Sequence, residues 1–238
     1  MVQVSEPPQR SRKREITVAV GDALVASVPF ADGALAVAYV KAVSASYERR
    51  QQQWARDVTA ALADLSDRVG GLSLESLAQN DTFLDALAHA SRIAVLTGQQ
   101  EKLDALRNAV LNAALPSGDI DADTQAIFLR HIGDLTPSHL HMLKLLVDVS
   151  SSDRSTDDMV LLHQHRAKFQ TAQARGFYEQ LDRDLSAAGL IYQGIIWDAL
   201  RRAGEHPPEV MPTSTGLAFL RFITDPRGNF ETDGGPHP

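Results

Sequence analysis

Residues 33–69 read GALAVAYVKAVSASYERRQQQWARDVTAALADLSDRV, and this stretch decides the fold class. Its mostly apolar stripe recurs at steps of three and four residues, which places its members on one face of a helix. The stripe consists of Val40, Val43, Tyr47, Gln51, Trp54, Val58, Ala61, Leu65 and Val69. At 1.5 Å per residue the predicted helix is about 55 Å long, and the glycine pair at 70–71 ends it.

This stripe is narrow, because the opposite face of the predicted helix is charged. A narrow apolar stripe is typical of a coiled-coil-like contact, either within the chain or with a second copy. We therefore predict an interface that includes Tyr47, Trp54, Val58 and Leu65. The expected partner is another protein or a homo-oligomer.

The chain before this helix has a basic and an apolar part. Residues 1–15 contain two prolines and a basic run, with little to bury, and are predicted to be disordered. Residues 16–40 are the most hydrophobic stretch, but Asp22, Pro29 and Asp32 interrupt any membrane-spanning helix. Three readings stay open: a soluble hairpin packed on the core, a membrane-associated hairpin and a cleaved signal peptide.

Shorter helices are expected after residue 72. Asn80 and Asp81 begin one whose inward residue is Phe83 or Leu84, and Thr136-Pro137 begins another, with threonine at the N-cap and proline at the first helical position. The helix from Pro137 to about Val149 is apolar on most sides, which predicts a central position in the core.

The C-terminal part is expected to end in a winged-helix-like unit. After an exposed loop at 150–158, helices are predicted near 158–171 and 176–188, a strand at 190–192, a wing at 193–212 and a last helix at 214–223. The predicted fold class is mostly α, with a long N-terminal helix, a helical bundle core and a small β-hairpin. The expected segments are a disordered tail (1–15), the apolar segment with the long helix (16–71), the core with its winged-helix-like end (72–225) and a flexible tail (226–238).

Catalytic and metal-binding motifs are not recognisable. No cysteine is present, and neither nucleotide-binding glycine loops nor hydrolase signatures occur. The acidic triplet Asp119, Asp121 and Asp123 lacks the glycine and final glutamate of a calcium loop. Two histidine pairs, at 139/141 and 163/165, cannot chelate one ion from one helix, since residues two apart point in different directions. We predict no catalytic residue, cofactor or metal.

Two segments resemble known families. FYEQLDRDLSAAGLIYQ from residue 177 and PTSTGLAFLRFI from residue 212 resemble the helix, strand, wing and final helix of winged-helix domains. With two upstream stretches, residues 80–115 and 127–146, the chain over about residues 75–224 resembles uncharacterised bacterial helical proteins related to the abortive-infection alpha family. The matching positions are Lys102, Leu103, Ala105, Leu106, Arg107, Asn108, Ala109, Leu135, Thr136, Pro137, His139 and Leu140. This resemblance implies a link to phage defence and no established catalytic residues.

Charge separates the function classes that follow. The chain has a net charge of −7, and its candidate recognition helix, residues 176–188, carries three acidic residues against one basic residue. Duplex DNA would repel such a helix, which argues against a nucleic-acid partner. We expect a cytoplasmic, non-enzymatic helical interaction or regulatory protein in bacterial stress or phage defence. The alternatives are a membrane-associated effector acting through residues 16–43 and a winged-helix DNA-binding regulator.

Overall fold

A computed structural model describes residues 33–70, 72–115, 120–150, 155–202 and 212–230 of the chain. These residues are mostly α-helical, as predicted. The chain forms two compact units, residues 1–55 and 56–238, and the boundary falls within helix α2 (Gly33–Arg68). The predicted basic tail and the apolar segment before residue 33 lie outside the described residues, as does the end of the predicted C-terminal tail.

Helix α2 has the length that its stripe predicts, and it ends two residues before Gly70. On its polar side, Arg68 Nε lies 3.0 Å from a carboxylate oxygen of Asp64, a bridge one turn apart. Among the helices that the structure describes, none is both long enough and apolar enough to cross a membrane.

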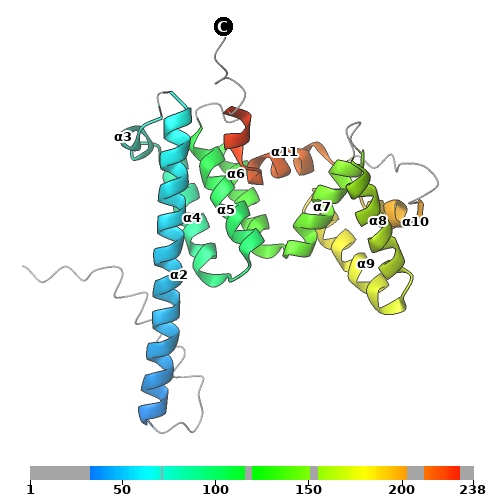
Figure 1. Cartoon of the computed structure of the whole chain (residues 1–238), viewed down its shortest axis with the longest axis horizontal. Coiled ribbons are helices and arrows are strands. Elements are labelled where there is room, and N and C mark those ends of the chain that lie inside the picture. The colour runs from blue at the N-terminus through cyan, green and yellow to red at the C-terminus, as the bar shows by residue number, and fades with distance from the viewer. Residues whose placement is uncertain (1–32, 71, 116–119, 151–154, 203–211, 231–238) are drawn as a thin grey trace, which may run out of the picture. The chain divides into compact units, whose positions relative to one another are not determined.

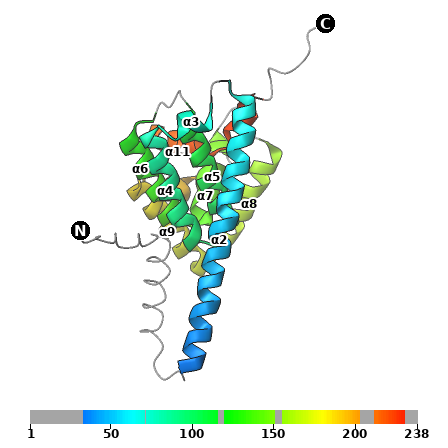
Figure 2. The ribbon, with the colours of Figure 1, turned by 90° about the vertical axis from the view of Figure 1, so that its left-hand side faces the viewer.

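The first half of the larger unit consists of α3 (Leu74–Leu77), α4 (Asp81–Leu96), α5 (Gln100–Ala114) and α6 (Ala122–Asp134). Helices α4, α5 and α6 lie side by side in both views (Figures 1 and 2). Asn80 and Asp121 begin α4 and α6 as N-caps, each accepting a backbone N–H three residues later. Phe83 is the inward residue of α4, whereas Leu84 is 40% exposed.

The second half contains α7 (Pro137–Ser150), α8 (Thr156–Phe169), α9 (Ala172–Ala187) and α10 (Ile195–Arg202). Helix α7 packs against α8, α9 and the last helix, which fits its mostly apolar surface (Figure 1). Ser155 and Asp158 form a capping box at the start of α8. This box explains why the helix begins earlier than the predicted limit at 158.

The predicted strand and wing are wrong for the residues that the structure describes. Residues 190–192 form no strand, and Ile195–Arg202 is helix α10 rather than one arm of a hairpin. The cause is Asp182 in α9, whose carboxylate accepts the backbone N–H groups of Gly194 and Ile196 at 2.8 and 3.0 Å. These two bonds satisfy donors at the start of α10 and so favour a helix there. Residues 203–211 of the predicted wing lie outside the described part.

The last elements are α11 (Ser214–Ile223), with the predicted bounds, and the 3-10 helix η1 (Pro226–Phe230), within the predicted flexible tail. Phe219 of α11 packs edge-on against Phe128 of α6, with ring centroids 5.4 Å apart. Both rings are buried, so this contact joins α11 to the α4–α6 layer.

Candidate functional site

The predicted interface residues occupy two environments along α2. Trp54 is 6% exposed, Val58 is 4% exposed and Leu65 is fully buried. Tyr47 is only half-buried. Within the single chain, Trp54, Val58 and Leu65 therefore belong to the core, whereas the beginning of the stripe retains surface for a partner. An interface with another protein stays a prediction for that beginning.

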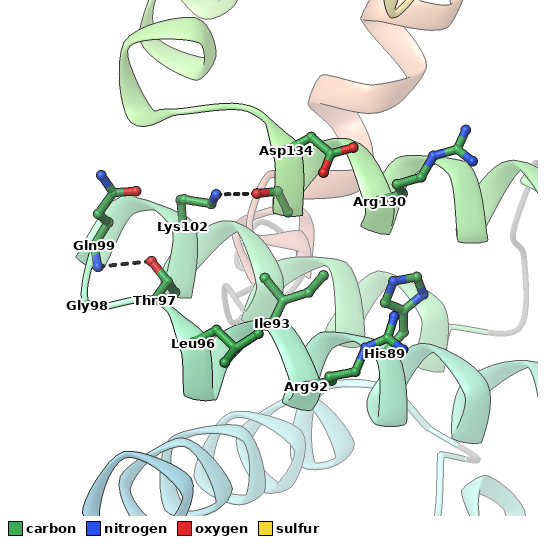
Figure 3. A pocket seen from close by; sticks show the side chains of 11 residues that line it. His89, Arg92, Ile93, Leu96, Thr97, Gly98, Gln99, Lys102, Arg130 and Asp134 are labelled. Carbon is green, nitrogen blue, oxygen red and sulfur yellow. Dashed lines mark hydrogen bonds between the residues drawn. The ribbon is translucent and has the colours of Figure 1, made fainter. Parts of the chain in front are cut away.

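A second candidate site is a cleft of about 620 Å³ within the larger unit. Figure 3 shows α4 on one wall, α6 on the other and the turn from α4 to α5 at one end. The lining residues are His89, Arg92, Ile93, Leu96, Thr97, Gly98, Gln99, Lys102, Arg130, Gly133 and Asp134. Three of these side chains are basic, two arginines and one lysine, and one is a carboxylate. The cleft is thus positive on an acidic chain.

Lys102 is the buried cation of the cleft, with only 8% of its surface exposed. Its ammonium group donates to the backbone carbonyl of Gly133 at 2.6 Å, in the last turn of α6 (Figure 3). A cation suits the negative end of a helix dipole and satisfies a carbonyl that has no partner within its own helix. Burial lowers the pKa of Lys102, and the nearby Asp134 carboxylate opposes that effect.

His89 and Arg92 lie one turn apart on α4 and face the cleft (Figure 3). Partial burial lowers the pKa of His89, and the positive charges of Arg92 and Arg130 lower it further. The lowered pKa favours the neutral form of His89 at pH 7. Among the described residues, neither Arg92 nor Arg130 forms an ion pair or a side-chain hydrogen bond.

A hydrogen-bonded series of side chains in the described structure resembles a catalytic relay and consists of Thr136, His139 and Asp184. Nδ1 of the buried His139 lies 3.1 Å from the Thr136 backbone N–H and 2.8 Å from the Thr136 hydroxyl. His139 Nε2 lies 3.2 Å from Asp184 Oδ2. Because Nδ1 accepts the backbone N–H, we assign the proton to Nε2, which donates to Asp184.

This arrangement is a helix cap rather than a catalytic relay, since the basic lone pair of Nδ1 already accepts from the backbone. It corrects the expected cap of α7, in which the Thr136 hydroxyl would accept a backbone N–H. Instead the side chain of His139 reaches back to Thr136, and its far nitrogen ties α7 to α9. His141, by contrast, is exposed on the polar stripe.

The remaining histidines and acidic residues form no metal site in the part of the chain that the structure describes. His165 Nδ1 lies 2.7 Å from the Tyr178 hydroxyl, and Asp121 caps α6. Asp119 lies outside the described residues.

The resemblance motif around residues 102–109 has a structural explanation. Besides Lys102, it contains Asn108, whose side-chain amide donates to the carbonyl of Ile223 at 2.9 Å. Asn112, one turn later, donates to the carbonyls of Phe222 and Thr224 at the same distance. The two asparagines thus satisfy carbonyls at the end of α11, four residues apart on one face of α5.

The cationic cleft was missed by sequence reasoning. The spacing of His89 and Arg92 was a visible signal that they share a helix face. Nothing in the sequence indicated that Lys102 and Arg130, from two other helices, would line the same cleft.

Comparisons with protein-family models, with curated proteins and with solved structures found no match. The similarity to the abortive-infection alpha family consequently stays an expectation from the motifs alone.

Proposed function

We propose that this chain is a non-enzymatic helical interaction protein that binds through the beginning of the α2 stripe. The occupant that we favour is a second copy of the chain. The motif resemblance adds the proposal that this interaction serves a bacterial stress or phage-defence response.

The observation that carries the proposal is the incomplete burial of the stripe before Trp54. Tyr39 is 49% exposed, and Val40, Val43 and Tyr47 are half-buried. Val40, Val43 and Tyr47 belong to the same stripe whose later members Trp54, Val58 and Leu65 are buried. A shallow groove of about 310 Å³ follows this face, lined by Tyr39, Ala42, Val43, Ser46, Tyr47 and Arg50.

A second copy suits this face because two identical stripes can pair along their length. Apolar residues spaced by three and four supply the knobs and holes of such a contact. Association of two identical patches also gives a closed dimer, the commonest form of soluble oligomer. Removal of Tyr39 and its neighbours from water favours this pairing.

Sedimentation equilibrium tests the proposal. We expect the parent chain to show twice its 25.9 kDa mass at micromolar concentration. Val43→Glu places a charge in the stripe and should weaken the dimer at least tenfold. Gln52→Glu adds the same charge on the exposed face of α2 and serves as the matched control, with no expected change.

A parent that stays monomeric at all accessible concentrations would contradict the proposal, as would equal effects of the two variants. The membrane alternative predicts instead that the full chain sediments with liposomes. Much of its proposed segment, residues 16–43, lies outside the described residues.

A further inference from the structure

The cleft between α4 and α6 concentrates positive charge without neutralising it. Arg92, Lys102 and Arg130 line it together with a single acidic residue, Asp134. With His89 neutral, the lining has a net charge of +2, although the whole chain has −7. On a chain with 30 acidic residues, unneutralised cations around one hollow point to an anionic ligand.

Lys102 gives this cleft a preorganised donor. Its ammonium group uses one N–H on the Gly133 carbonyl and forms no other hydrogen bond with a described residue. An ammonium group has three donors. Two N–H donors of Lys102 therefore remain for a ligand. The side chain that carries them is nine-tenths buried and is held in place by its hydrogen bond to α6. Little conformational entropy is left to lose when such a group binds an anion.

The two arginines stand on different helices, Arg92 on α4 and Arg130 on α6 (Figure 3). Both are exposed and keep their guanidinium donors free of ion pairs with other described residues. Both lie near enough to His89 to lower its pKa. An anion near this histidine would offset that effect and could accept from either guanidinium, whose planar fork matches phosphate oxygens.

The rest of the cleft sets the size and character of the ligand. A volume of about 620 Å³ lies within the range of small-molecule sites. Ile93 and Leu96 supply an apolar wall, and Leu96 is 69% exposed. The start of α5 also lines the cleft through Gln99 and Lys102, and Gln99 makes no side-chain cap at the beginning of that helix.

We propose that this cleft binds a small organic phosphate. Its phosphate group is held by Arg92, Arg130 and Lys102, and its apolar body lies against Ile93 and Leu96. A phosphomonoester carries close to two negative charges at pH 7, which balance the net charge of the lining. A carboxylate would leave part of that positive charge uncompensated.

Calorimetric titration with phenyl phosphate tests this assignment on the full chain. We expect saturable binding that Arg92→Gln and Arg130→Gln each weaken at least fivefold. Arg183→Gln removes an exposed arginine of α9 outside the cleft and should leave binding unchanged. Backbone amide shifts in NMR spectra should concentrate in residues 89–102 and 130–134. Lys102→Met should abolish binding; because it also removes a helix cap, the two arginine variants decide the outcome.

Two further probes separate the parts of the ligand. Inorganic phosphate should bind more weakly than phenyl phosphate, and Leu96→Ser should weaken only the aromatic probe. Benzoate should bind at least tenfold more weakly than phenyl phosphate. The proposal would be overturned if benzoate bound as tightly as phenyl phosphate or if all three arginine variants lost affinity equally. The absence of amide shifts in the cleft residues would overturn it as well.

Discussion

Among the described glycines, Gly216 is the one at which an added side chain meets the closest contact. A Cβ atom at this position would lie 2.0 Å from the carbonyl oxygen of Leu190. The clash involves backbone, which no side-chain rotation can relieve. We predict that Gly216→Ala lowers the free energy of unfolding by about 3 kcal/mol, because α11 must move away from the turn after α9. Denaturant unfolding measures this loss.

Gly176 provides the matched control, since it lies within α9 and a Cβ there meets no atom within 4 Å. Gly176→Ala should raise the unfolding free energy by about 0.5–1 kcal/mol, because alanine loses less backbone entropy in a helix. If both substitutions had the same sign, the close approach of α11 to Leu190 would be in doubt.

The same contact shows what the sequence could reveal at the scale of single residues. The run from Thr213 to Phe219 was recognised as the start of the last helix, and that helix is confirmed, but the wing expected before it is not. In the structure the Thr213 hydroxyl accepts the N–H of Gly216 and donates to the carbonyl of Gly189 at 2.6 Å. The glycine permits close approach, and Phe219 enters the core. The Thr213–Phe219 pattern could be recognised in the sequence. Its contact with Gly189, 24 residues before Thr213, could not.

At the scale of elements, α7 offers the sharpest test. Its cap depends on His139, which accepts the Thr136 N–H and bonds to Asp184. We predict a loss of about 1–2 kcal/mol for His139→Ala, because a cap and an inter-helix bond disappear together. Leu143 is fully buried, so Leu143→Ala should cost about 2–5 kcal/mol through the cavity that it leaves.

His141→Ala is the control on the same helix. Its side chain is exposed, so the change should stay within about 0.5 kcal/mol in thermal or denaturant unfolding. A larger loss for His141→Ala than for His139→Ala would contradict the assignment of the cap.

Helix existence and helix starts were predictable from local chemistry. The long stripe predicted α2, and Asn80 and Pro137 marked two N-termini, because caps act within one turn of chain. Helix α10 was missed because its first donors bind Asp182, which belongs to the preceding helix. The cleft was missed for the same reason, since its cations come from three helices. Contacts between elements carry no local signal.

At the scale of the larger unit, an ion cluster joins the two ends of its chain. Arg227 in η1 lies between Asp64 of α2 and Asp225, with a nitrogen 2.9 Å from the Asp64 carboxylate. Arg227 and Asp64 are 163 positions apart in sequence. Their pairing ties the end of α2 to the segment that follows α11.

This cluster makes the stability of the unit depend on pH, which gives the last prediction. Hydrogen bonds to Arg68 and Arg227 lower the pKa of Asp64 below its ordinary value of 3.8, and a hydrogen bond to Arg227 lowers that of Asp225. Near and below pH 3.8 the unfolded chain therefore binds more protons at these two positions than the folded chain does. Their contribution to folding is complete well above that pH, and it is lost as the pH falls through the lowered folded values.

Urea unfolding should show a free energy of unfolding that declines as the pH falls from 6 to 3. Arg227→Gln should make this decline shallower and should lower the free energy of unfolding at pH 6. The exposed Arg201→Gln in α10 should leave the slope as in the parent. A parent slope unchanged by Arg227→Gln would show that other carboxylates set the acid response.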